Sequence, residues 1–423
     1  GDAAPIIDQY ATDPDFKIDD RWQAEWALAQ QLQIQGKTEL AYARVGRLLA
    51  AQRGEDPRFA ELNPELRARM GWLHAKLAAD SDRFEAALQH LDSLLKSLDG
   101  LTPVLKGEIE SEALLLRAQT ELALKREAPA IATFKRLRDE YVQSEAALRS
   151  YLIESAYYEQ QEKIPLAQQK LTELVDNPAY KTGLKPAYDR APQFPYAYYQ
   201  LALLSEKLGQ ERDLEEANRR LEQLTQLKTA ADLMFEARMK QGAILQKRSD
   251  FPAAQRVFEF VVNNYAQRPD VVYALLALAD CHSAQISTDT PNAPRHASAA
   301  ESLYEQLRDR VDAPADVKVE AGYKRGRLLA QRGQPERAAQ AWMADVIEPS
   351  PILKEGAGRI TLNDQQPYWL SRTLMELGAL YETLEKIPEA RKAYQLVLQA
   401  RLDPAESVAK DALRRLGRRD PVQ

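Results

Sequence analysis

The stretch LMELGALYETLEKIPEARKAYQLV, residues 374–397, decides the fold. Two small residues in it, Gly378 and Ala390, stand twelve positions apart. The large residues Tyr394 and Val397 follow Ala390 by four and seven positions. Residues spaced by three or four lie on one face of an α-helix. Two antiparallel helices can approach closely where both present small side chains, and large residues then fill the gap to the next pair. The stretch therefore predicts a helix pair.

The same spacing recurs along the chain. Alanine is common here, so the small pair alone would be weak evidence, but its conjunction with the large positions is strong because it occurs nine times. One unit is interrupted, since Ala279 is followed only after an insertion by Ala300, Tyr304 and Leu307. The other units are Ala29, Ala41, Val45, Leu48; Ala75, Ala87, Leu91, Leu94; Ala118, Ala130, Phe134, Leu137; Ser155, Ala167, Leu171, Leu174; Ser205, Ala217, Leu221, Leu224; Gly242, Ala254, Phe258, Val261; Gly326, Ala338, Trp342; and the unit quoted above.

This pattern resembles the tetratricopeptide repeat (TPR) family, and the resemblance extends from about Trp22 to Leu416. The family's aromatic residue near the start of each unit is mostly replaced, for example by Glu25 and Gly71. Successive second-helix alanines lie 37 to 52 positions apart, whereas a TPR unit has ~34 residues. The chain is closest in style to TPR proteins of bacterial envelopes. The resemblance implies an all-α fold, a right-handed α-α superhelix of about nine helix pairs with a C-terminal capping helix.

The units and the segments between them predict the domain organisation. We expect an N-terminal extension over residues 1–20, the repeat array over residues 21–404, and a capping helix and tail over residues 405–423. Stretches rich in proline, glycine and polar residues predict insertions in the array near residues 177–195, 287–297 and 348–367.

Composition narrows the class of protein. The 423 residues are 45% hydrophobic and 28% charged, which is typical of a folded protein. A net charge of -6 without a long basic run argues against nucleic-acid binding. No stretch approaches the ~18–20 apolar residues of a membrane helix, so we expect no transmembrane segment. Cys281 is the only cysteine, which excludes an intramolecular disulfide, and its apolar surroundings predict a buried residue.

Motifs of catalysis and of cofactor binding are absent from the sequence. It has no P-loop, no HExxH and no GxSxG. Gly356-Ala357-Gly358 is only half of a dinucleotide-binding signature. No pair of the four histidines has the i, i+4 spacing of metal ligands on a helix; they are His74, His90, His282 and His296. We therefore predict no enzymatic activity, no cofactor and no metal site.

The first helices supply the candidate binding residues. In TPR arrays, the residue three before the first small position points toward the concave surface, and the same face continues one turn later. Large side chains at such positions can anchor a peptide, and amides and cations can bind its backbone or a carboxylate. In a competing interpretation the large residues pack between helices and the polar ones are solvated. The candidates are Trp26, Trp72, Lys76, Gln119, Met239, Gln246, Tyr323, Arg327 and Met375.

An aromatic-rich segment provides a second candidate surface. We expect this segment to be a loop. Its tyrosines either contact a ligand, since such rings can stack on sugars, or form a local packing cluster. The loop residues are Tyr188, Tyr196, Tyr198 and Tyr199.

The sequence thus predicts a non-enzymatic scaffold that binds a protein or peptide in its concave surface. The alternative is a carbohydrate- or peptidoglycan-binding module, or a helical scaffold domain of a cell-wall assembly. Residues 1–5, GDAAP, resemble what remains after a leader and a tag are removed. This favours a periplasmic or cell-envelope location, with the cytoplasm as the other choice.

Overall fold

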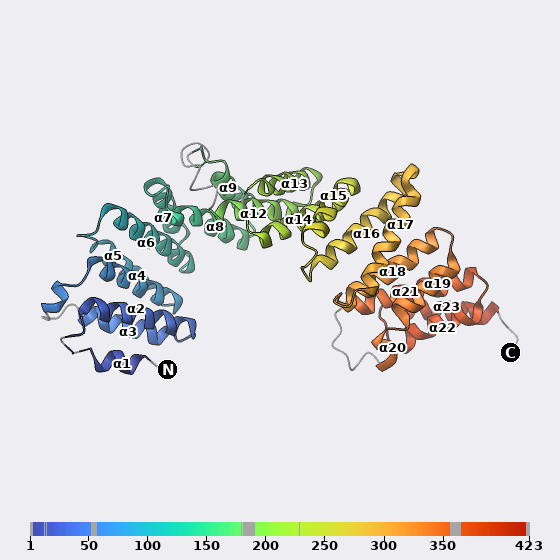
Figure 1. Ribbon diagram of the computed structural model, residues 1–423, viewed down its shortest axis with the longest axis horizontal. Coiled ribbons are helices and arrows are strands. Elements are labelled where there is room, and N and C mark those ends of the chain that lie inside the picture. The colour runs from blue at the N-terminus through green and yellow to red at the C-terminus, as the bar shows by residue number, and fades with distance from the viewer. Residues whose placement is uncertain are drawn as a thin grey trace. The chain divides into compact units, whose positions relative to one another are not determined.

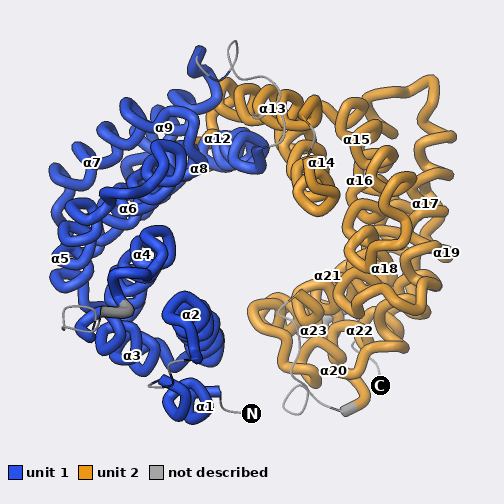
Figure 2. The backbone as a smooth tube through the Cα atoms, turned by 60° about the vertical axis from the view of Figure 1, so that its left-hand side comes forward, with its two compact units in different colours: residues 1–204 blue, residues 205–423 orange. Residues whose placement is uncertain are grey.

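The computed structural model describes residues 3–11, 13, 15–51, 57–178, 180, 191–227, 229–355 and 365–419. Within these ranges the chain is helical and contains no strand, so the all-α prediction is confirmed (Figure 1). Contacts divide the chain into two compact units, residues 1–204 and 205–423 (Figure 2). None of the described helices is both long enough and apolar enough to cross a membrane.

Unit 1 starts with a short helix, α1 (Ala4–Gln9), and continues with four antiparallel helix pairs (Figure 1). A 3-10 turn, η1 (Pro57–Ala60), lies between the first two pairs. The pairs are α2 (Ile18–Ile34) with α3 (Thr38–Ala51), α4 (Pro64–Asp80) with α5 (Phe84–Leu95), α6 (Pro103–Ala123) with α7 (Glu127–Glu140), and α8 (Glu145–Gln160) with α9 (Ile164–Val175).

The boundary between the units falls near the end of α12 (Gln193–Leu208), which is followed by α13 (Glu211–Thr225). Unit 2 then has four more pairs. They are α14 (Ala231–Lys247) with α15 (Phe251–Asn264), α16 (Val271–Thr288) with α17 (Ala293–Asp309), α18 (Ala315–Gln331) with α19 (Pro335–Trp342), and α21 (Gln365–Thr383) with α22 (Ile387–Gln399). When α12 and α13 are counted together, the described residues contain the nine predicted pairs.

The predicted capping helix is α23 (Ala405–Arg419), which packs on α22. Its apolar face is buried, with Ala409 and Leu416 fully inaccessible, and it joins the last hydrophobic cluster of unit 2. The region predicted as an insertion near 287–297 is mostly helical: α16 ends in it, a 3-10 turn η2 (Thr290–Asn292) follows, and α17 begins. The region near 348–367 contains α20 (Pro351–Glu355), which follows a π-helical turn η3 (Met343–Ile347).

Small residues lie where paired helices meet, as the repeat pattern requires. Every predicted small position is buried, from Ala29 and Ala41 in the first pair to Gly378 and Ala390 in the last. The large residues that follow are buried as well, each at most 4% exposed. The repeat pattern therefore describes the core of each helix pair.

Glycine stands at the first small position where a ring lies directly against the helix backbone. A Cβ atom at each of these glycines would come within 3.0 Å of the aromatic residue sixteen positions later. Ala118 faces Phe134 without such a conflict, so an aromatic residue alone does not require glycine. The glycine pairs are Gly242 with Phe258, Gly326 with Trp342, and Gly378 with Tyr394.

First and second helices form two layers in unit 1. The first helices α2, α4, α6 and α8 contact one another in succession and line the inner side, while α3, α5, α7 and α9 lie outside (Figure 2). This arrangement places the residues predicted for a concave surface on the inner layer.

Candidate functional site

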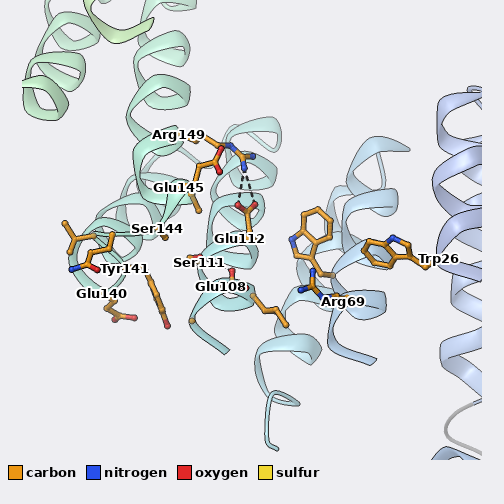
Figure 3. A pocket seen from close by; sticks show the side chains of 16 residues that line it. Trp26, Arg69, Glu108, Ser111, Glu112, Glu140, Tyr141, Ser144, Glu145 and Arg149 are labelled. Atoms are coloured by element: carbon orange, nitrogen blue, oxygen red, sulfur yellow. Dashed lines mark hydrogen bonds and ion pairs between the residues drawn. The ribbon is translucent and has the colours of Figure 1, made fainter. Parts of the chain in front are cut away.

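A cavity of 920 Å³ lies on the inner layer of unit 1. Its lining comes from α2, α4, α6 and α8, together with the link from α7 to α8 (Figure 3). Two predicted residues, Trp26 on α2 and Trp72 on α4, line it. Four successive repeats therefore contribute side chains to one concave site.

Trp26 and Trp72 hold equivalent places in successive repeats, three residues before Ala29 and Ala75. Both are partly buried and pack against apolar clusters of unit 1. Part of each tryptophan therefore packs in the core, as the packing interpretation holds. The rest borders the cavity, where it could anchor a peptide.

An ion pair spans the cavity floor between α6 and α8. The Arg149 guanidinium donates to both carboxylate oxygens of Glu112, at 3.1 and 3.4 Å (Figure 3). Even so, desolvation raises the pKa of Glu112, and the nearby Glu145 carboxylate adds to the rise, against the opposite effect of Arg149. The Glu112 carboxylate is therefore only partly compensated by its cation.

The link from α7 to α8 forms one wall of the cavity. The hydroxyl of Tyr141, in this link, donates to Glu110 of α6 at 2.6 Å. Burial and this carboxylate raise the pKa of Tyr141 to about 12, so it stays a donor at neutral pH. The Ser144 side chain then caps α8 by accepting from the Ala147 N–H at 3.1 Å. These bonds fix the wall relative to α6.

A second cavity of 710 Å³ lies between the C-terminal halves of α6 and α8. The predicted residue Gln119 is exposed and lines it, with Leu122, Ile153 and Tyr157. The predicted residue Lys76, on α4, lines neither this cavity nor the larger one, and its ammonium donates to Asp80 at 3.0 Å.

Most of the predicted residues of unit 2 contact neighbouring helices. Tyr323 is 1% exposed, and its hydroxyl donates to Glu376 at 2.5 Å. Its ring lies 5.0 Å from that of Trp369. Met375 is partly buried against the same cluster, while Arg327 one turn after Tyr323 is exposed. For Tyr323 the structure favours the packing interpretation.

Two further predicted residues of unit 2 are engaged by neighbouring helices. Met239 packs against the cluster that contains Phe235. The Gln246 amide donates to the Ala277 carbonyl at 3.1 Å and to the Cys281 sulfur at 3.3 Å. Cys281 is buried, as predicted, and desolvation raises the pKa of its thiol to about 12.

The tyrosines of the predicted loop lie on a helix where they are described. Tyr196, Tyr198 and Tyr199 are residues of α12, so the expectation that they belong to a loop is wrong. Tyr196 is 50% exposed and the other two are partly buried. Tyr188 lies outside the described residues.

The histidines form two pairs that the sequence reading missed. The rings of His74 and His90 stack with centroids 3.9 Å apart, and Nδ1 of His282 lies 3.0 Å from Nδ1 of His296. The first pair is separated by sixteen residues, the spacing that joins small and large positions, and this signal could have revealed it. In the described part of the chain, no three His, Cys, Asp or Glu side chains are grouped to hold a metal ion.

The acidic lining was also missed. Glu108 and Glu112 follow one another at i, i+4 on α6, and this spacing places them on one face. Sequence alone could not show that Glu145 and Arg149 of α8 meet them, because this contact joins helices of different repeats.

These features define an α-helical repeat protein with an open cavity on the inner layer of its first unit. The family model "Tetratricopeptide repeat" matches residues 112–144, which run from the middle of α6 to the residue before α8. The TPR resemblance is therefore confirmed in this repeat, and the described residues form a stack of helix pairs of the TPR kind. The matched repeat provides both Glu112 and the wall around Tyr141.

No curated protein matches the chain. Among solved structures, the C-terminal part of a TPR repeat-containing protein from Cytophaga hutchinsonii is 14% identical, with 81% of this chain and 99% of that chain covered and a TM-score of 0.41. A TPR protein from Parabacteroides merdae is 12% identical, with 65% and 90% covered and a TM-score of 0.33. A human IFIT1 dimer with PPP-AAAA is 14% identical, with 99% and 86% covered and a TM-score of 0.38.

Proposed function

We propose that the cavity on the inner layer of unit 1 binds a polypeptide segment of a partner protein, without catalysing a reaction on it. The observation that carries the proposal is the 920 Å³ cavity with Trp26 and Trp72 at equivalent positions of successive repeats. Partly buried tryptophans are frequent anchors at protein interfaces, because they bury a large area at small entropic cost.

The cavity walls support this role because they are held in place before a ligand arrives. The inner helices contact one another, and the Tyr141 hydroxyl joins the α7–α8 link to Glu110 of α6. A site whose residues are already ordered loses less conformational entropy on binding. The predicted cell-envelope location and the predicted glycan-binding alternative stay predictions.

The proposal is tested by selecting peptides from a random 12-residue phage library on the full chain and measuring their affinity by calorimetry. Trp72→Ala should weaken the selected peptides at least about tenfold, since it removes a central anchor. Tyr196→Ala is the matched control, because Tyr196 is an exposed aromatic residue of unit 1 outside the cavity. It should change the affinity less than about twofold.

Circular dichroism and thermal melting establish that both variants fold. Trp26→Ala provides an independent variant on another helix. If no peptide is selected, or if the selected peptides bind both tryptophan variants as tightly as the wild type, the proposed function is wrong. Loss of binding in Tyr196→Ala alone would favour the surface of α12 instead.

A further inference from the structure

We propose that the segment bound by this cavity is basic, and that a lysine or arginine side chain enters between the two tryptophans and the carboxylates of α6 and α8. This inference rests on the proposed function and specifies its partner. It follows from which charges line the cavity, which of them are already paired, and what the tryptophans add.

The charges that line the cavity are mainly negative. Four carboxylates face two guanidinium groups, and all six belong to unit 1. The carboxylates are Glu108, Glu112, Glu140 and Glu145, and the guanidinium groups are Arg69 and Arg149. A cavity with this balance attracts cations and repels acidic segments.

Both lining cations are already engaged. Arg149 donates to Glu112 at 3.1 Å, and Arg69 donates to Glu65, outside the lining, at 2.8 Å. Glu140 accepts from Arg136 at 3.0 Å, also from outside the lining. The existing pairs therefore leave little cationic charge for the rest of the cavity.

Two carboxylates stay without a cation. In the part of the chain that the structure describes, Glu108 and Glu145 form no ion pair, and both are exposed. Glu145 accepts only a neutral amide hydrogen, from Gln193 at 3.1 Å. Glu112 is paired with the guanidinium of Arg149 alone, and the nearby Glu145 carboxylate repels the Glu112 carboxylate. A cationic group from a ligand would meet under-compensated carboxylates here.

The tryptophans provide the second half of the fit. Indole faces attract Lys and Arg cations, and the apolar stems of these side chains pack well on aromatic rings. Trp26 and Trp72 line the same cavity as the carboxylates of Glu108, Glu112 and Glu145. A neutral apolar side chain could fill the aromatic part but would leave the carboxylates unpaired, at an energetic cost. A basic side chain satisfies both parts.

The first experiment uses the phage-selected peptides whose binding to the full chain depends on Trp72. These peptides should be enriched in lysine or arginine. A selected lysine peptide, synthesised again with Nε-acetyl-lysine, should bind at least about tenfold more weakly, because acetylation removes the charge and keeps the stem. Trp72-dependent peptides that are neutral or acidic, or indifferent to acetylation, would overturn this inference and leave the proposed function standing.

The second experiment changes the protein. The double variant Glu108→Gln, Glu145→Gln should weaken the lysine peptide about fivefold or more. The double variant Glu39→Gln, Glu85→Gln is the matched control, since it makes the same charge change on exposed residues of the outer helices α3 and α5. Equal weakening in both doubles would indicate only the overall field of unit 1 and would overturn the local contact.

Arg149→Gln should strengthen the binding of the lysine peptide, whereas loss of folding could only weaken it. Without this guanidinium, Glu112 is free to pair with the ligand, so at pH about 8 the lysine peptide should bind at least about threefold more tightly. The Arg149–Glu112 pair is partly exposed, so its removal should cost little stability. Unchanged or weaker binding by a folded Arg149→Gln variant would contradict the inference.

Discussion

The same repeat position has different fates in the two units. In unit 1, Trp26 and Trp72 stand three residues before the first small position and border an open cavity. In unit 2, Tyr323 stands at the same position on α18, but it is 1% exposed and donates to Glu376 of α21. The repeat pattern thus places a side chain on the inner layer, but the next first helix decides whether that side chain stays open to a ligand.

The core positions differ between the units in a related way. The first small residue is alanine or serine in the four complete repeats of unit 1. In unit 2 it is glycine three times, each against an aromatic ring. The three rings that face these glycines fill space between paired helices, whereas Trp26 and Trp72 of unit 1 remain partly exposed.

The largest expected effect compares these aromatic residues directly. Tyr323→Ala should lower the free energy of unfolding by about 3–5 kcal/mol, because it empties a buried site and leaves Glu376 without its donor. Trp72→Ala should cost roughly 1–2 kcal/mol, since only part of the side chain is buried. Urea unfolding followed by circular dichroism measures both. Equal losses would remove the distinction between the buried and the open position.

Much of the fold could be predicted from the sequence, since it depends on local spacing. Ala75 and Ala87 meet within one helix pair, and their spacing of twelve residues requires only a short turn between helices. The open cavity could not be predicted because Trp72, Glu112 and Arg149 come from three different repeats. Their meeting depends on how closely successive first helices approach, which the long connections between repeats do not reveal.

A smaller effect comes from pH and again differs between the units. Burial, together with the charge of His90, lowers the pKa of His74 to about 4. The unfolded chain, with a pKa near 6.5, then binds a proton that the folded chain does not, so stability falls as the pH falls from about 6.5 toward 4. Between pH about 7.5 and about 5 the loss should be on the order of 2 kcal/mol.

The variant His74→Phe isolates this effect because it keeps an aromatic ring stacked on Tyr42 and His90 and removes the titration. Its unfolding free energy should depend less on pH over the same range. In unit 2 the pKa of His282 is also lowered by burial and by His296, but the nearby Glu259 opposes the shift. His282→Phe should therefore change the pH dependence less. A pH profile that His74→Phe leaves unaltered would show that the ring is not held neutral.

The last comparison tests why unit 2 uses glycine. Gly326→Ala should destabilise the protein by about 1–3 kcal/mol, since the added methyl group would overlap the Trp342 ring and force α18 and α19 apart. Gly417→Ala is the matched control: it is also helical, but a Cβ atom there meets nothing within 4 Å. It should stabilise the protein by about 0.5–1 kcal/mol, because alanine favours the helix. Changes of opposite sign in the free energy of unfolding would show that Gly326 is required for close packing. Stabilisation by both substitutions would mean that α18 and α19 can separate without cost.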